Sequence, residues 1–103
     1  YTWLLLIPRR AGAVEIVDLD EPDRVELMWE IAAASRALKE TVRCDKLNVA
    51  ALGNIVPQLH VHVIARRRGD AAWPKPVWGA APTAPYAKGE AQALAAKLAA
   101  RLK

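Results

Sequence analysis

The chain has 103 residues, of which 53% are hydrophobic and 25% charged, a composition that fits one globular domain and argues against a disordered chain. Its net charge of +4 is spread between Arg66–Arg68 and the C-terminal segment, which favours a solvated surface over a specific nucleic-acid footprint. The single cysteine, Cys44, excludes an internal disulfide, and the longest apolar run, Trp3–Ile7, is too short to span a membrane. We therefore expect a cytoplasmic protein without a membrane segment.

Two extended segments are predicted near the N-terminus. Residues 1–8 form a short apolar run that ends at Pro8, which is typical of a buried strand. The sequence enters this strand at Tyr1 without a Met, so we expect a further segment before it in the full-length protein. Residues 14–17 are a second candidate strand.

A helix of roughly 20 residues is predicted from Asp20 to Val42. Asp20 is a favourable N-cap, and Pro22 falls in the first turn, where its missing N–H costs nothing. An apolar stripe at helical spacing is expected to face the core, with Trp29 also in the core. The stripe consists of Val25, Met28, Ile31, Ser35, Leu38 and Val42, widened by Leu27 and Ala32.

The second half of the chain is predicted to begin with two strands, over residues 47–52 and 55–65, separated by a turn at Gly53-Asn54. In the second strand, apolar and polar side chains alternate between two faces. Leu59, Val61, Val63 and Ala65 point to one face, and Gln58, His60, His62 and Ile64 to the other.

The remaining residues are predicted to form a tail and a helix. A proline-rich segment over residues 73–86 predicts an extended or wrapping loop, in which Trp73 and Trp78 pack as part of the tail or, alternatively, cap a base or contact a dimer partner. Residues 88–103 are rich in Ala and Leu, which predicts a terminal helix. We interpret residues 1–103 as a single domain with its core over 1–68, a tail over 69–86 and a C-terminal helix over 87–103.

The chemistry is predicted at the two histidines of the chain, His60 and His62. Alternate residues of a strand lie about 6.5–7 Å apart, so both imidazoles can reach one phosphate group. A neutral imidazole supplies a nucleophilic nitrogen at pH 7, and the second ring, when protonated, can bind a phosphoryl oxygen or assist the leaving group. Arg66–Arg68 is interpreted as a solvated strand end, with one arginine reaching a phosphate as the alternative.

The residues by themselves leave two other interpretations of His60 and His62 open. Both rings can be structural. Alternatively, they can belong to a metal site that Cys44, Asp45 or Asp70 would complete, although such a site needs further ligands. We expect neither a metal ion nor a cofactor.

The segment Val56-Pro57-Gln58-Leu59-His60-Val61-His62-Val63-Ile64 resembles the signature of the histidine-triad (HIT) family, in which histidines alternate with apolar residues. The resemblance extends to Leu4–Arg10, to the long helix and to Leu47–Val49, and so covers roughly residues 3–66. Within the family, the chain resembles bacterial HIT-domain proteins and hydrolases of diadenosine polyphosphates.

This resemblance implies an α+β fold with an antiparallel sheet of five strands, one long helix, a C-terminal helix and a homodimeric assembly. It also implies a nucleotide hydrolase or nucleotidyl transferase that attacks an α-phosphate through a nucleotidyl-histidine intermediate. His60 matches the nucleophile and His62 the histidine that contacts the phosphate. Asn48 and Asn54 match polar residues that bind the substrate.

Gln58 departs from the HIT pattern, because the family usually has its first histidine there. The resemblance implies that the backbone carbonyl at this position orients the nucleophilic ring, and a glutamine still supplies that carbonyl and a substrate-binding amide. What Gln58 lacks is an ionisable ring, and Ile55 lacks a hydroxyl that some members place near the leaving group. The alternative is therefore a nucleotide-binding or interaction protein that has the fold without catalysis.

Overall fold

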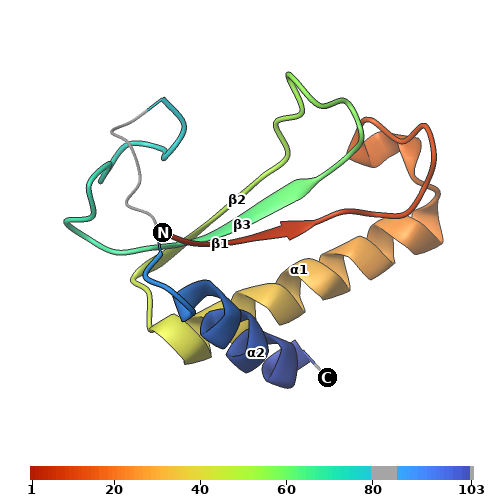
Figure 1. Cartoon of the computed structure of the whole chain (residues 1–103). Coiled ribbons are helices and arrows are strands. Elements are labelled where there is room, and N and C mark those ends of the chain that lie inside the picture. The colour runs from red at the N-terminus through yellow and green to blue at the C-terminus, as the bar shows by residue number, and fades with distance from the viewer. Residues whose placement is uncertain (80–85, 103) are drawn as a thin grey trace.

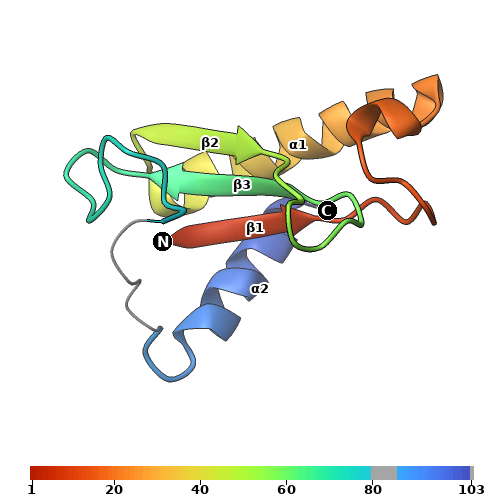
Figure 2. The same ribbon diagram turned by 90° about the horizontal axis from the view of Figure 1, so that it is seen from above.

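The protein is built from an antiparallel sheet with two helices on one of its faces (Figure 1). The computed structural model describes residues 1–79 and 86–102. The elements in chain order are β1 (Thr2–Leu6), the 3-10 turn η1 (Ile16–Asp18), α1 (Glu21–Val42), β2 (Lys46–Ala50), β3 (Val61–Arg66) and α2 (Glu90–Leu102). The three strands lie in the order β1-β3-β2, and Figure 2 shows β3 between its two neighbours.

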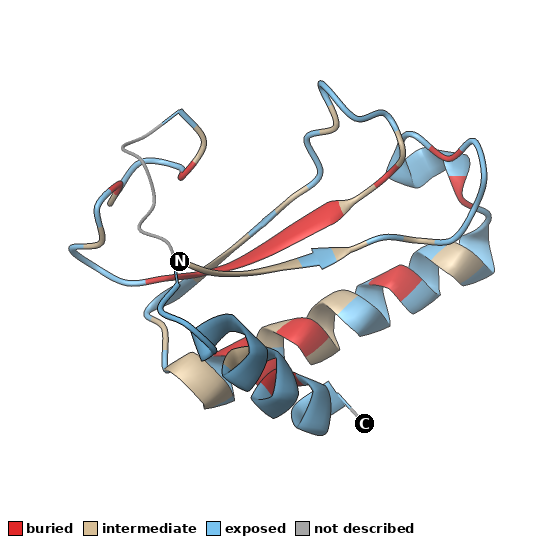
Figure 3. Cartoon of the chain, in the orientation of Figure 1, coloured by how far each residue is buried: buried red, intermediate tan, exposed pale blue. Residues whose placement is uncertain are grey.

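β3 is the central strand, and all six of its residues are buried (Figure 3). Its register pairs His62 with Leu5 on β1 and with Ala50 on β2. Because side chains alternate along a strand, Val63 faces the helices while His62 faces the opposite side of the sheet. The alternation that the sequence predicts for this segment is therefore confirmed within β3.

The helices cover the apolar face of the sheet. One cluster of buried residues joins α1 and α2 to β3, and a second joins the first half of α1 to the segment before it and to the start of β3. The first cluster contains Ala34, Ala37, Leu38, Val63, Ala65 and Leu98, and the second contains Ala13, Leu19, Leu27, Leu59 and Val61. These clusters fix β3, and with it the two histidines, against a packed layer.

The predicted start of α1 is confirmed, and its predicted buried face is correct for Leu27 and Leu38 but wrong at three positions in the first half of the helix. The Asp20 side chain accepts a hydrogen bond from the backbone N–H of Asp23 at 3.2 Å, as an N-cap does. Val25, Met28 and Trp29 are 52%, 63% and 69% exposed, respectively. The helix has more apolar residues than one sheet face and α2 can cover, so only the face that includes Leu27, Ala34 and Leu38 is buried.

The expectation of five strands is not met, because the described residues contain three. The candidate strand at residues 14–17 turns instead into η1, where the Asp18 carboxylate accepts hydrogen bonds from the backbone N–H groups of Val14 (3.0 Å) and Glu15 (2.8 Å). These local bonds compete with a sheet ladder. The strand predicted at 55–65 is also shorter and begins at Val61.

The C-terminal part of the chain follows the prediction in outline. α2 starts at Glu90 rather than at residue 88, and residues 80–85 of the predicted tail lie outside the described residues. Within the part of the chain that the structure describes, no helix is long and apolar enough to cross a membrane.

Candidate active site

The rings of His60 and His62 lie side by side on the face of the sheet that the helices leave free. Their centroids are 5.1 Å apart, and both rings line a cavity of about 280 Å³. The loop between β2 and β3 supplies one wall, through residues 52–56, and Trp78 supplies another. The loop between β2 and β3 and the segment that follows β3 both rise on the side of the sheet away from α1 and α2 (Figure 1).

His60 directly precedes β3, and its ring is oriented by the backbone. Its Nδ1 lies 2.8 Å from the carbonyl oxygen of Gln58. A carbonyl oxygen can only accept a hydrogen bond, so Nδ1 of His60 carries a proton and donates the hydrogen bond to this oxygen. In the neutral ring, Nε2 is then unprotonated and keeps a lone pair that is available for nucleophilic attack.

His62 is held by side chains from two other segments. The indole Nε1–H of Trp3 on β1 donates a hydrogen bond to Nδ1 of His62 at 2.9 Å. The centroid of the Trp78 ring lies 5.0 Å from that of the His62 ring, in an edge-to-face arrangement. Burial, followed by the neighbouring charge of His60, lowers the pKa of His62 below its ordinary value. The site therefore favours a neutral imidazole at this position.

Comparison with known proteins adds family membership to this geometry. The sequence profile of the HIT domain matches residues 1–69. The chain belongs to the HIT-domain family. Membership of this family suggests nucleotide binding or hydrolysis. A comparison with curated proteins gives no match.

Solved HIT structures match nearly the whole of this chain, which spans about three quarters of their length. A histidine triad protein from Bradyrhizobium japonicum is 58% identical, with a TM-score of 0.94 over 98% of this chain and 75% of that one. A HIT protein from Sinorhizobium meliloti is 44% identical, with a TM-score of 0.92 over 97% and 74% of the two chains. One from Marinobacter aquaeolei is 46% identical, with a TM-score of 0.90 over 97% and 73%.

Within this HIT domain, the structure separates the predicted substrate-binding residues into two groups. Asn54 lines the same cavity as His60 and His62. Asn48 and Gln58 are not among the residues that line it. The side-chain amide of Gln58 instead donates to the carbonyls of Pro8 (3.4 Å) and Arg10 (3.2 Å), so it ties the segment before β3 to the loop after β1.

The other two arginines of the basic run are exposed as expected, but the expectation of a solvated strand end is wrong for Arg66. It is 1% exposed, and its guanidinium forms two hydrogen bonds with the Asp70 carboxylate, at 2.7 and 2.9 Å. It also donates to Oδ1 of Asn48 at 2.8 Å and lies 5.6 Å from the centroids of Tyr1 and Trp73. The sequence signal for the ion pair was the acidic residue four positions after Arg66. No sequence signal indicated the contacts of Arg66 with more distant residues, such as Asn48.

The hydrogen bond from Arg66 orients the side chain of Asn48. Its oxygen accepts from Arg66, which leaves its amide N–H groups to face other partners. Trp3, by contrast, was not singled out by the sequence. Its contact with His62 joins residues that are 59 positions apart, and no local pattern predicts such a contact.

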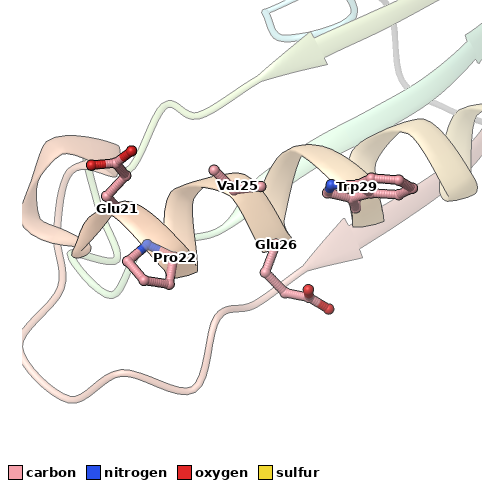
Figure 4. A pocket seen from close by; sticks show the side chains of 5 residues that line it. All are labelled: Glu21, Pro22, Val25, Glu26 and Trp29. Atoms are coloured by element: carbon pink, nitrogen blue, oxygen red, sulfur yellow. The ribbon is translucent and has the colours of Figure 1, made fainter.

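The described residues offer no metal site, and a second hollow lies away from the histidines. Among residues 1–79 and 86–102, no group of three or more His, Cys, Asp or Glu side chains is placed to hold a metal ion. A larger and more open hollow of about 620 Å³ lies on the outer side of α1, between Pro22, Val25 and Trp29 (Figure 4). We place the candidate active site at the smaller cavity because only that one contains the imidazoles.

Proposed function

We propose that this HIT domain is a nucleotide hydrolase or nucleotidyl transferase that reacts at an α-phosphate through a covalent nucleotidyl-His60 intermediate. The observation that carries the proposal is the 2.8 Å contact between Nδ1 of His60 and the Gln58 carbonyl, which leaves the Nε2 lone pair for attack. Dinucleoside polyphosphates and nucleotidyl phosphoramidates are the substrate classes that fit this reaction.

The reaction has two balanced steps. In the first, Nε2 of His60 attacks the α-phosphorus, a P–N bond forms, and the bond to the leaving group breaks as that group leaves with the electron pair and takes a proton from solvent. In the second, water attacks the same phosphorus, the P–N bond breaks, and a nucleoside monophosphate leaves while a proton passes to solvent. In a transferase, an alcohol or amine takes the place of water.

His62 and Asn54 are proposed to hold the phosphate during both steps. Both residues line the cavity with His60, and His62 is close enough for the two rings to contact one phosphate group. Hydrogen-bond donors that are already in place where charge develops lower the barrier without reorganisation.

One observation favours a second candidate function, a nucleotide-binding protein without turnover. Gln58, at the first position of the motif, has no ionisable ring. Its side chain is hydrogen-bonded to the carbonyls of Pro8 and Arg10 and does not line the cavity. Catalysis then depends on His60 and His62 alone.

Trapping of the intermediate separates the two functions. The parent is mixed with adenosine 5′-phosphoramidate or diadenosine tetraphosphate, quenched without acid, and analysed by intact-mass and fragment mass spectrometry. We expect one nucleotidyl group on His60 and its loss in His60→Ala, together with a fall in kcat of about 10⁴-fold or more. His62→Ala should still form the adduct on His60, only more slowly, because it removes a group that holds the phosphate and not the nucleophile. Nucleotide binding by calorimetry, with neither adduct nor turnover in the parent, would favour the binding protein.

We also propose that the assembly is a homodimer that uses the outer face of α1. Three large apolar side chains of this helix are exposed, namely Val25, Met28 and Trp29. Two of them, Val25 and Trp29, also line the hollow in Figure 4. Large apolar side chains that are exposed together on one face of a helix are candidates for a protein interface. A second copy of the chain would cover them.

A further inference from the structure

The indole of Trp3 donates a hydrogen bond to one of the two ring nitrogens of His62. Its Nε1 lies 2.9 Å from Nδ1 of His62, and the two ring centroids are 5.4 Å apart. An indole N–H can donate a hydrogen bond but cannot accept one. Nδ1 of His62 must therefore carry a lone pair where it meets Trp3.

We propose that Trp3 is a positioning residue that holds His62 in the neutral tautomer with its proton on Nε2, an inference that rests on the proposed function. Protonation of Nδ1 would point two N–H groups at each other, and the tautomer with its proton on Nδ1 would do the same. The hydrogen bond therefore favours this form over both the cation and the other neutral form. Trp3 is not among the residues that line the cavity, so it acts through His62.

The consequence is that the two histidines present complementary atoms. His60 donates its Nδ1–H to the Gln58 carbonyl and keeps a lone pair on Nε2. His62 accepts at Nδ1 from Trp3 and keeps a proton on Nε2. The site thus offers one nucleophilic nitrogen and one neutral donor for a phosphoryl oxygen. Because His62 is neutral, the nucleophile does not lie beside an imidazolium.

The surroundings of His62 act in the same direction. Across the sheet its neighbours are Leu5 on β1 and Ala50 on β2, and Trp78 lies edge-to-face against its ring. Of these neighbours and the adjacent His60, only His60 is titratable, and a positive charge there also opposes protonation of His62. Burial adds to this effect, because His62 is 9% exposed.

Nitrogen-15 NMR of the histidine rings reads the tautomer directly. In the parent at neutral pH we expect His62 to show a protonated Nε2 and an unprotonated Nδ1, and His60 to show the reverse. If His62 in the parent carries its proton on Nδ1, or shows a mixture of tautomers, the inference is overturned without any variant.

A pair of tryptophan variants then assigns the effect to the hydrogen bond. Trp3→Phe keeps an aromatic ring and loses the N–H, so we expect His62 to become a mixture of tautomers and its titration midpoint to rise. Trp78→Phe, the control, alters a ring whose centroid lies 5.0 Å from that of His62, compared with 5.4 Å for Trp3, and should leave the tautomer of His62 unchanged. A Trp3→Phe protein whose His62 keeps the single tautomer and the parent's titration midpoint contradicts the proposal.

These measurements do not depend on turnover. An enzyme that forms the His60 adduct but shows a mixed His62 tautomer overturns the role of Trp3 alone. A protein that has the expected tautomers but forms no adduct and turns over no nucleotide overturns the proposed function alone.

Discussion

At the scale of single residues, Gln58 shows how one position can have separate backbone and side-chain roles. Its carbonyl accepts the Nδ1–H of His60, while its side-chain amide donates to the loop that follows β1. A histidine at this position would provide the same carbonyl, because the backbone does not change with the side chain. The departure from the family pattern therefore leaves the orientation of His60 intact.

Gln58→Ala should accordingly lower stability more than it affects chemistry. Loss of the bonds to the carbonyls of Pro8 and Arg10 is expected to lower the free energy of unfolding by about 1 kcal/mol. Urea unfolding measures this change, with the exposed Gln92→Ala on α2 as a near-neutral control. Adduct formation on His60 should persist. A Gln58→Ala protein of unchanged stability that no longer forms the adduct would show that the side chain, not the carbonyl, is what the site needs.

Arg66 and Asp70 form a pair whose environment differs from that of an ordinary surface ion pair. The Arg66 and Asp70 side chains are 2% and 15% exposed, whereas those of Arg101 and Glu40 are each 52% exposed. Hydrogen bonding to Arg66 is the main cause that lowers the pKa of Asp70 to about 2. Because the unfolded carboxyl titrates at about 3.9, the pair stabilises the fold above that pH and loses its contribution as the pH falls towards 2.

Asp70→Asn should therefore destabilise the protein at neutral pH and lose its effect in acid. Removal of one partner of a buried pair is expected to cost about 3 kcal/mol at pH 7. The matched change in the exposed pair, Glu40→Gln, should cost less than about 1 kcal/mol. Urea unfolding over a pH series measures both. Equal costs in the two pairs, or a difference between parent and Asp70→Asn that stays constant as the pH falls from about 4 to about 2, would contradict this account.

At the scale of elements, α1 has two apolar faces with different roles. Leu38 is fully buried between the sheet and α2, whereas Met28 on the same helix is 63% exposed. The helical period alone assigns both residues to one stripe. Contact with the sheet selects the face that includes Leu38 and leaves the other to solvent.

Truncation of each residue tests which face of α1 supports the fold. Leu38→Ala should lower the free energy of unfolding by about 2–5 kcal/mol, because it leaves a cavity in the core. Met28→Ala should change it by less than about 0.5 kcal/mol in dilute protein. Thermal or urea unfolding gives both values. If the two substitutions cost the same, the burial of α1 described above is incorrect.

At the scale of the whole molecule, the chain combines a site face and an apolar outer helix face on different sides. The cavity with His60 and His62 lies on the sheet face that the helices leave free, while Val25, Met28 and Trp29 lie on α1. The proposed homodimer would therefore cover an apolar surface without closing the cavity.

Trp29→Glu tests the homodimer, because it places a charge in the centre of the exposed patch on α1. Sedimentation velocity should show a dimer for the parent and a monomer for this variant, with an unchanged circular dichroism spectrum. Val17→Glu alters another exposed apolar residue, 76% exposed in η1, and should leave the dimer intact. A monomeric parent, or a dimer that survives Trp29→Glu, would rule out this interface.

Much of the architecture and of the site can be predicted from local sequence. The N-cap at Asp20 and the apolar alternation around His60 and His62 are short-range patterns, and each follows from the geometry of one element. Together with the motif, they place both imidazoles on one face before any contact is known. The 3-10 turn at Asp18 was missed because its hydrogen bonds compete with a strand that the same residues could also form.

The tertiary structure decided what each of these residues contacts. Trp3 reaches His62 across 59 positions, and Arg66 turns from a solvated strand end into a buried cation only because Asn48, Asp70 and the carbonyl of Lys75 converge on it. Strand pairing fixes such contacts, and pairing depends on the register between distant segments rather than on the composition of either one. The sequence by itself thus determined that two histidines share a face, and the fold determined which of their nitrogens carry the protons.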